Sequence, residues 1–234
     1  MTALFYTFIY EPILSVLVFI YRDISFGDLG LAIIILTILV RIVLFPIFYK
    51  SAKDQTVMQK LQPKAKEIQN KYKTNKEEQA KVLMALYKEN KFNPLSGFLF
   101  LLIQLPIFIA LFGVFSHELS NPAFDSVMFF GFINLGERSV VIAIIAAALQ
   151  YIQGKMMVSS TKPAIGTVSQ TNQADRTASQ IARAGSMMTI VAPAITLVFL
   201  FNLPSALGVY WGTSTAFSVI QQIYINKKIN KEKK

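Results

Sequence analysis

A single arginine, Arg41, stands inside a nearly uninterrupted apolar run that extends from Gly30 to Phe48. At about 1.5 Å rise per residue, a helical run across a bilayer would place Arg41 roughly 18 Å from Leu29 and roughly 12 Å from Tyr49, within the hydrocarbon layer. A charge at that depth costs about 2.5–3.5 kcal/mol on insertion scales and more than about 10 kcal/mol in simulations. Arg41 therefore needs a partner carboxylate, a water-filled cavity or a route to the interface.

The five long apolar segments from Leu29 onward are interrupted by neutral polar residues and contain no acidic residue. Thr37 lies one helical turn before Arg41 on the same face, and Gln104 interrupts a second apolar segment. The last apolar segment carries a polar stripe at helical spacing: Trp211, Thr215, Ser218 and Gln222. Such groups are costly against lipid and favourable around water. The pattern predicts a hydrophilic cavity in which Arg41 attracts an anion from outside the chain.

Each of these residues also has a purely structural interpretation. A Ser or Thr in a span often bonds to its own helix, a Gln can bridge two helices, and the long side chain of Arg41 can reach toward the headgroups. For Thr215 and Ser218 the structural interpretation is the simpler one. For Arg41, the depth and the absence of acids in the spans favour a function.

The composition does not indicate catalysis. Of 234 residues, 53% are hydrophobic and 15% charged, with no Cys and a single His, His117. Because no phosphate-binding loop, metal-ligand cluster or nucleophile constellation is visible, we expect no catalytic residue, no metal, no cofactor and no enzyme activity. Although the net charge is +10, the basic residues flank apolar runs and no nucleic-acid-binding motif occurs, so nucleic acid is not the expected main ligand.

The hydropathy pattern predicts an all-α polytopic membrane protein with five transmembrane helices. Residues 1–25 are expected to form an extracytoplasmic interfacial helix, because Glu11-Pro12 interrupts their apolar run and Tyr6 and Tyr10 recur at helical spacing. A spanning helix over residues 4–21 stays open as the alternative. The predicted spans are 26–49, 93–115, 138–158, 185–201 and 205–225.

The segments between the spans differ in character. Residues 50–92 show amphipathic periodicity and are predicted to form a cytoplasmic helical hairpin that captures or docks substrates, with a break of its first arm at Pro63. Thr74 and Glu77 are in capping-box register for its second arm. The other connections are an extracytoplasmic loop at 116–137, a cytoplasmic loop at 159–184 and a basic cytoplasmic tail at 226–234.

The distribution of basic residues predicts the orientation. Most of the 23 Lys and Arg residues lie in 50–92, in 155–184 and in the tail. The positive-inside rule places these segments in the cytoplasm, which leaves Arg22 and Arg138 on the other side. We therefore expect a multi-pass protein with its N-terminus outside and its C-terminus in the cytoplasm. The absence of a transit-peptide pattern favours a bacterial plasma membrane.

From about Phe26 to the tail, the chain resembles the YidC/Oxa1/Alb3 family of membrane protein insertases. The resemblance rests on Thr37, Arg41 and Pro46 in the first span and on four further stretches in this order: LQPK, MALYKENKFNPLSG, LLIQLPIF and NLPSALGVYW. With no large extracytoplasmic domain before the first span, the chain looks like a short bacterial form.

The resemblance implies a groove that is open to the cytoplasm and to lipid. Its implied groove positions are Thr37, Arg41, Gln104 and Trp211, beside which the polar stripe places Thr215 and Ser218. The resemblance also implies a hydrophobic slide, which maps to Leu105, Phe108, Ile195 and Phe199.

The expected function is that of an insertase and chaperone that inserts and helps to fold integral membrane proteins without ATP hydrolysis. Its expected partners are nascent membrane proteins and membrane lipids, with the ribosome and the Sec translocon as further candidates. The alternative is a small-anion or solute transporter with a midplane site at Arg41, and a third interpretation is a structural scaffold. Crosslinks from the groove to nascent chains would favour the insertase, whereas solute uptake into liposomes would favour the transporter.

Overall fold

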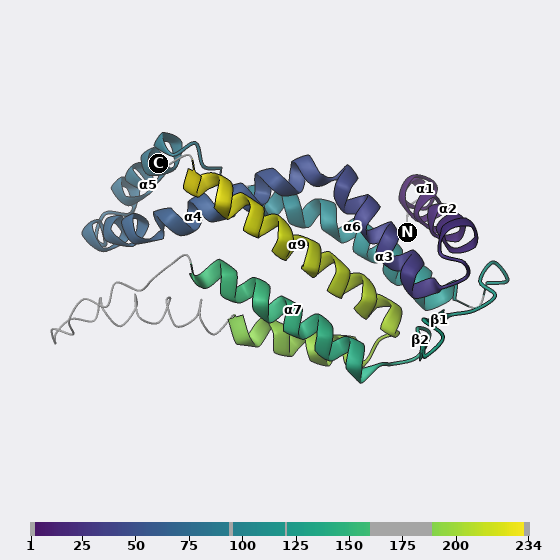
Figure 1. The fold of residues 1–234 in the computed structure, drawn as a ribbon. Coiled ribbons are helices and arrows are strands. Elements are labelled where there is room, and N and C mark those ends of the chain that lie inside the picture. Colours follow the sequence, from purple (N-terminus) through teal and green to yellow (C-terminus); the bar gives the residue numbers. More distant parts are fainter. Residues whose placement is uncertain (1–2, 94–95, 120, 160–188, 232–234) are drawn as a thin grey trace.

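A computed structural model describes residues 3–93, 96–119, 121–159 and 189–231 (Figure 1). Apart from Ser159, the predicted cytoplasmic loop 159–184 lies outside the described residues, and so do residues 185–188 of the fourth predicted span. The described chain is mostly helical, in agreement with the predicted all-α class.

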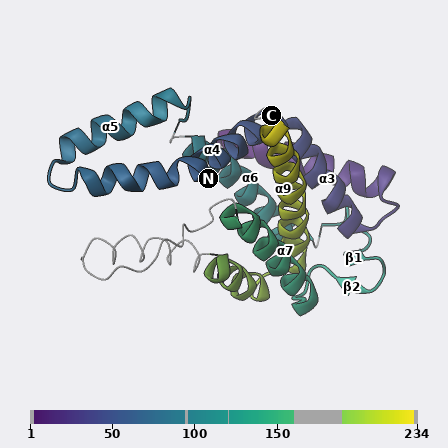
Figure 2. The ribbon, with the colours of Figure 1, turned by 60° about the vertical axis from the view of Figure 1, so that its left-hand side comes forward.

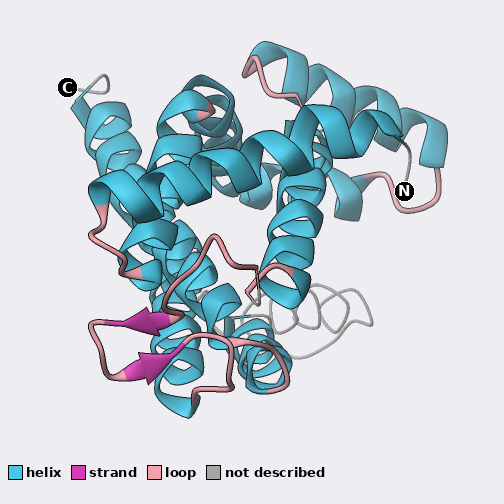
Figure 3. Ribbon diagram, turned by 90° about the vertical axis from the view of Figure 1, so that its right-hand side faces the viewer, coloured by secondary structure: helices cyan, strands magenta, loops and turns pink. Residues whose placement is uncertain are grey.

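One long helix, α9, runs through the middle of the fold (Figure 1). It packs most extensively against α7 and next against α3. Helices α4 and α5 project together from one end (Figure 2), while strands β1 and β2 lie at the opposite end (Figure 3). The bounds are α3 Leu29–Val43, α4 Phe45–Lys71, α5 Lys76–Glu89, α6 Ser96–His117, β1 Met128–Phe129, β2 Ile133–Asn134, α7 Val140–Ser159, the helix Thr189–Phe201 and α9 Ser205–Lys231.

The predicted number of spans is only partly matched by helix length. Among the described residues, the 22-residue stretch Ala3–Ile24 is long and apolar enough to cross a membrane, and a second candidate arises if α3 and the first part of α4 count as one bent span. Three further apolar helices are shorter: Leu102–His117, Val140–Met156 and Thr189–Phe201. The number of five spans therefore stays a prediction.

The N-terminal stretch is helical throughout, although its hydrogen-bond pattern changes along it. It comprises α1 Ala3–Phe5, η1 Tyr6–Tyr10, α2 Glu11–Phe19 and η2 Ile20–Ile24. Pro12 does not interrupt it: Tyr10 and Glu11 keep helical backbone angles, and the π-helical turn η1 directly precedes the proline. Its Tyr10 hydroxyl donates to Glu118 at 3.1 Å and its Tyr21 hydroxyl to the Ser126 carbonyl at 2.9 Å. These bonds hold the stretch against the segment that follows α6.

The first predicted span is not one straight helix. Helix α3 ends at Val43, α4 begins at Phe45, and the two axes meet at an angle of 71°. Pro46 stands in the first turn of α4, a position that suits proline. In a helix that continued from α3, its ring would clash with the Ile42 carbonyl and its missing N–H would leave that carbonyl without a donor. The expected continuous helix over 26–49 thus gives way to an elbow at Leu44.

The predicted hairpin segment, residues 50–92, forms two helical arms joined by a turn, and two details differ from the prediction. Helix α4 runs through Pro63 without a break, and the second arm is capped by Asn75 rather than Thr74. The Asn75 side-chain oxygen accepts a 3.0 Å hydrogen bond from the Glu78 amide. Asn and Thr both suit this position, and the cap used lies one residue later than the predicted one.

We expect Asn75→Ala to destabilise α5 by about 1 kcal/mol, since it leaves a first-turn amide without its side-chain acceptor. Hydrogen exchange at the Glu78 amide should accelerate about fivefold, the factor that corresponds to this free energy. Thr74→Ala is the matched control and should change little. Faster exchange in the Thr74 variant alone would show that the capping box, and not Asn75, holds this helix end.

A close contact joins α3 to β1 at the end opposite the hairpin. A side chain at Gly30 would place its Cβ 2.7 Å from the Cβ of Phe129, and closer still to the Phe129 ring. Nearby, Asp28 caps α3 by accepting from the Leu31 amide at 2.8 Å, and its second oxygen accepts from the Phe130 amide. The residues at the start of α3 therefore hold the β1–β2 hairpin tightly against it.

Candidate functional site

Arg41 is buried between α3 and α9, with 7% of its surface exposed. Its Nε donates to the Ser214 hydroxyl at 3.1 Å, and its Nη2 donates to the same oxygen. The guanidinium carbon lies 4.5 Å from the centroid of the Phe48 ring, a cation–π geometry. Within the described part of the chain, no carboxylate pairs with Arg41. Its contacts satisfy some of its donors but do not cancel its charge.

Ser214 connects Arg41 to a larger set of polar side chains. The Gln104 amide donates to the Tyr210 hydroxyl, and Tyr210 in turn lies within hydrogen-bonding reach of Ser214. We call Arg41, Ser214, Tyr210 and Gln104 the arginine network. It joins α3, α6 and α9 by polar contacts inside an apolar bundle, where each unsatisfied polar group would be costly.

The sequence prediction missed Ser214 and Tyr210. It singled out Trp211 and Thr215, which are the next residues along α9, and a shift of one residue turns a side chain by about 100° around a helix. Spacing alone could have found the pair, because Tyr210 and Ser214 also stand one turn apart. Both are buried, with 4% and 6% of their surface exposed.

The other predicted groove residues make local contacts. The Thr37 hydroxyl donates to the Ile33 carbonyl at 2.6 Å, and the Ser218 hydroxyl donates to the Ser214 carbonyl at 3.0 Å. Both are bonds of a side chain to its own helix, the structural alternative foreseen for such residues. Thr215 is buried, with 7% of its surface exposed. Of the predicted groove residues, Gln104 and Arg41 belong to one network, whereas Thr37 and Ser218 bond within their helices.

The predicted slide residues lie on α6 and on the helix Thr189–Phe201. The Phe108 ring lies 6.5 Å from the Phe199 ring and 5.9 Å from the Trp211 ring, which it meets edge to face. Leu105, Ile195 and Phe199 are exposed, Ile195 at 63%. We call Leu105, Phe108, Ile195 and Phe199 the apolar wall. Trp211 lies beside it. Ser214 of the arginine network stands three residues after Trp211 on α9.

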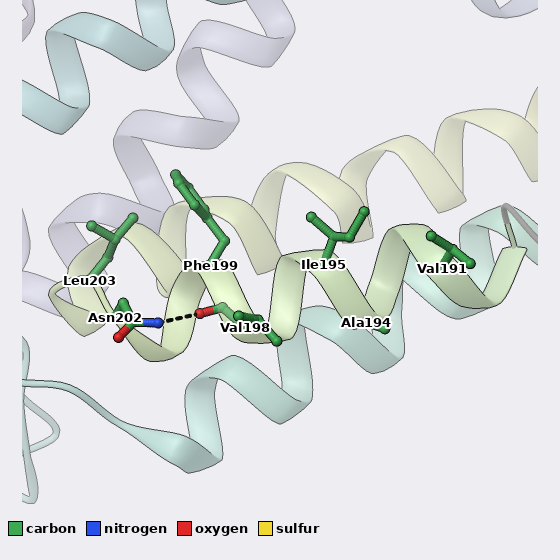
Figure 4. Close-up of a pocket in the computed structure, with 7 residues that line it drawn as sticks. All are labelled: Val191, Ala194, Ile195, Val198, Phe199, Asn202 and Leu203. Atoms are coloured by element: carbon green, nitrogen blue, oxygen red, sulfur yellow. Dashed lines mark hydrogen bonds between the residues drawn. The ribbon is translucent and has the colours of Figure 1, made fainter.

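A shallow apolar pocket of about 610 Å³ extends along the same helix (Figure 4). In Figure 4, Ile195, Phe199 and Leu203 point to one side of the helix. The polar side chain of Asn202 does not break the apolar character, because its amide donates to the Val198 carbonyl at 2.8 Å. The pocket lining comprises Val191, Ala194, Ile195, Val198, Phe199, Asn202 and Leu203.

A second polar contact joins α4 to α9 closer to the hairpin. The Gln222 amide donates to the Thr56 hydroxyl at 2.9 Å and to the Asn226 side chain at 3.0 Å. Gln222 and Thr56 are both buried. This contact fixes the base of the projecting hairpin to the central helix.

The sequence was then compared with known proteins. Residues 19–233 match the family described as 60Kd inner membrane protein. This chain belongs to the YidC/Oxa1 family. That result confirms the resemblance seen in the sequence. Proteins of this family are membrane proteins and not enzymes, and its members in bacteria are inner membrane proteins.

Several relatives carry the name membrane protein insertase YidC. The relative from Fusobacterium nucleatum is 34% identical over 224 residues, which cover 95% of this chain and 98% of the relative. That from Geobacter sp. strain M21 is 33% identical over 221 residues, 94% of this chain but 37% of the relative. That from Wolinella succinogenes is 30% identical, with 98% of this chain and 39% of the relative covered. The chain thus spans less than half of the Geobacter and Wolinella relatives and almost all of the Fusobacterium relative.

Proposed function

We propose that this chain is a membrane protein insertase that receives the polar flank of a client at the arginine network and its apolar segment at the apolar wall. One observation carries the proposal: the buried network and the apolar wall lie next to each other. Gln104 of the network and Phe108 of the wall stand one turn apart on α6, while Ser214 and Trp211 stand about one turn apart on α9. A client with a polar flank next to an apolar segment would place that segment on the wall with its flank beside the network.

Arg41 supplies the attraction for an acidic flank. Its partner, Ser214, is neutral, so the positive charge is not cancelled. A carboxylate forms a stronger hydrogen bond with a guanidinium than a hydroxyl does, and an acidic flank can therefore compete with Ser214. When the cell interior is negative, each acidic residue that moves outward gains about 2.3 kcal/mol per 100 mV. The membrane potential can thus release the flank from Arg41 without ATP hydrolysis.

The remaining parts of the proposal concern placement. We infer a multi-pass arrangement in a bacterial plasma membrane with the N-terminus outside and the C-terminus in the cytoplasm. In that arrangement the α4–α5 hairpin lies in the cytoplasm, where its basic surface can meet membrane lipids, nascent clients, a ribosome or a Sec translocon. The hydrophilic groove proposed around Thr37, Arg41, Gln104, Trp211, Thr215 and Ser218 opens toward that side and toward lipid.

A photocrosslinker tests the apolar wall. With the crosslinking residue at position 199, we expect adducts with the apolar segment of a nascent single-span client, because Phe199 is 43% exposed and contacts Phe108. Position 144 on α7 is the matched control, since Ile144 is 53% exposed but lies outside the wall. Adduct yield at 199 should exceed that at 144 about tenfold or more.

Equal yields at both positions would contradict a client path along the wall. If no adduct forms at 199 while purified protein carries a small anion into liposomes, the transporter with its site at Arg41 is the better function. If neither occurs and groove substitutions are silent in folded protein, the chain is a scaffold.

A further inference from the structure

The elbow at Leu44 forms a second groove that the proposed client path does not use. There, α4 turns away from the axis of α3 by 71°, while α9 continues toward its basic end. The space between the first turns of α4 and the last turns of α9 is a pocket of about 520 Å³. We call it the elbow groove. It is lined by Phe45, Tyr49, Phe217, Ile220, Gln221, Tyr224 and Lys228.

The elbow groove is apolar along its length and positive at one end. The Phe45 and Tyr49 rings lie 5.8 Å apart, and the Tyr49 and Tyr224 rings 6.5 Å apart. The Lys228 ammonium nitrogen stands 5.7 Å from the Tyr49 ring. Ile220 is 67% and Tyr224 55% exposed. A ligand that fits this surface has an apolar body and an anionic head.

One residue that lines the elbow groove, Gln221, has a side-chain amide donor without a hydrogen-bond partner among the described residues. Gln221 is 5% exposed, and among the described residues its amide nitrogen finds no acceptor. A buried amide donor without an acceptor costs about 1–3 kcal/mol. An ester or phosphate oxygen that enters the groove could accept this hydrogen bond after a small side-chain rotation.

The position of the groove narrows the class of ligand. α9 passes from apolar residues that end near Ile225 to the basic run that begins with Lys227 and Lys228. Such a transition, together with tyrosines, marks the interface between hydrocarbon and headgroups. Basic pockets between helices at this depth are typical binding sites for anionic phospholipid headgroups.

We propose that the elbow groove binds one anionic phospholipid. Its phosphate lies at Lys228, and one acyl chain follows Tyr49, Phe217 and Ile220 into the bilayer. The site depends on the membrane location of the family and not on the insertase function, so the two can fail separately.

Lipid selectivity is measured by tryptophan quenching. The chain has one tryptophan, so Trp211→Phe combined with Ile220→Trp leaves a single reporter in the groove. The protein is placed in bilayers that mix phosphatidylglycerol with phosphatidylcholine, with bromine on the acyl chains of one lipid or of the other. We expect phosphatidylglycerol to be favoured about fivefold, the preference that one lysine near a surface provides. About 1 M salt should reduce the preference, because screening is then nearly complete beyond about 3 Å.

Two lysines make the test specific. Lys228→Gln should reduce the preference to about one, whereas the adjacent Lys227→Gln, which removes the same charge one residue away, should keep most of it. Circular dichroism establishes that each variant is folded. Equal quenching by both lipids, or equal loss in both lysine variants, would overturn the proposal. So would displacement of brominated lipid by a soluble acidic peptide, which would make the groove a client site.

Discussion

Arg41→Ala should lower the insertion of a client with an acidic translocated flank about ten- to hundredfold. This range corresponds to the loss of one charge-assisted hydrogen bond, about 1.5–3 kcal/mol. A matched client with a neutral flank should stay within about twofold of wild type, because it gains nothing from the charge. Arg41→Glu should be worse than alanine, since it repels the acidic flank. The measurement is insertion of both clients into proteoliposomes under a set membrane potential.

Two companion variants separate charge from structure. Arg41→Lys keeps the charge and can reach the Ser214 hydroxyl, although it loses the planar stacking on Phe48; it should retain most of the activity. Ser214→Ala removes the partner but keeps the arginine, so selectivity for the acidic client should persist. Ser214→Ala could instead lower insertion of the acidic client as much as Arg41→Ala does, or Arg41→Ala could lower insertion of both clients equally. Either result would mean that Arg41 holds the helices together and does not act on the client.

Among the described helical glycines, Gly30 should be the one at which substitution by alanine is most destabilising. The new Cβ would lie 2.7 Å from the Phe129 Cβ, and a Cβ cannot rotate away, so strand β1 has to move off α3. Overpacking of this kind costs about 1–3 kcal/mol. For a chain of this length the midpoint of thermal unfolding should fall by roughly 2–12 °C. Thermal unfolding in nanodiscs, followed by circular dichroism, provides the measurement.

Gly212→Ala is the matched control, because it is also a helical glycine but its Cβ would make ordinary contacts at 3.8 Å with Ala146. It should be neutral or should stabilise by up to about 1 kcal/mol through helix propensity. The double variant Gly30→Ala with Phe129→Ala should recover part of the loss, since the ring is removed while the Phe129 Cβ remains. Additive losses in the double variant would mean that Gly30 does not contact Phe129.

The helical class and the family could be predicted from the sequence, because both rest on apolar runs and on the polar residues within them, which are visible in the local sequence. It did not single out Tyr210 and Ser214, because the packing of α9 decides which of its residues reach Arg41. Gly208 and Gly212 let α7 approach closely; a Cβ at Gly208 would lie 2.6 Å from Ile142. With that face of α9 against α7, Tyr210 and Ser214 are the α9 residues of the arginine network.

The elbow at Leu44 was missed for a different reason. The run from Gly30 to Phe48 is apolar throughout, and hydropathy does not distinguish a straight helix from a bent one. Pro46 was the available signal, since proline favours the first turn of a helix and clashes with the carbonyl four residues back when a helix continues through it. The displaced cap at Asn75 is a smaller case of the same kind, in which two adjacent residues are both good caps and the fold uses the second.

Because of the elbow, one helix, α4, connects the surroundings of Arg41 with the projecting hairpin. Phe48, whose ring faces the Arg41 guanidinium, stands near the start of α4, which runs from Phe45 to Lys71 and ends at the turn of the projecting hairpin. Thr56, which accepts a hydrogen bond from Gln222 of α9, lies between Phe48 and the turn. At about 1.5 Å per residue, the outer arm from Thr56 to Lys71 is roughly 22 Å long and the inner arm to Phe48 roughly 12 Å. If α4 tilts as a rigid body about Thr56, Phe48 moves in the direction opposite to Lys71, by about half the distance.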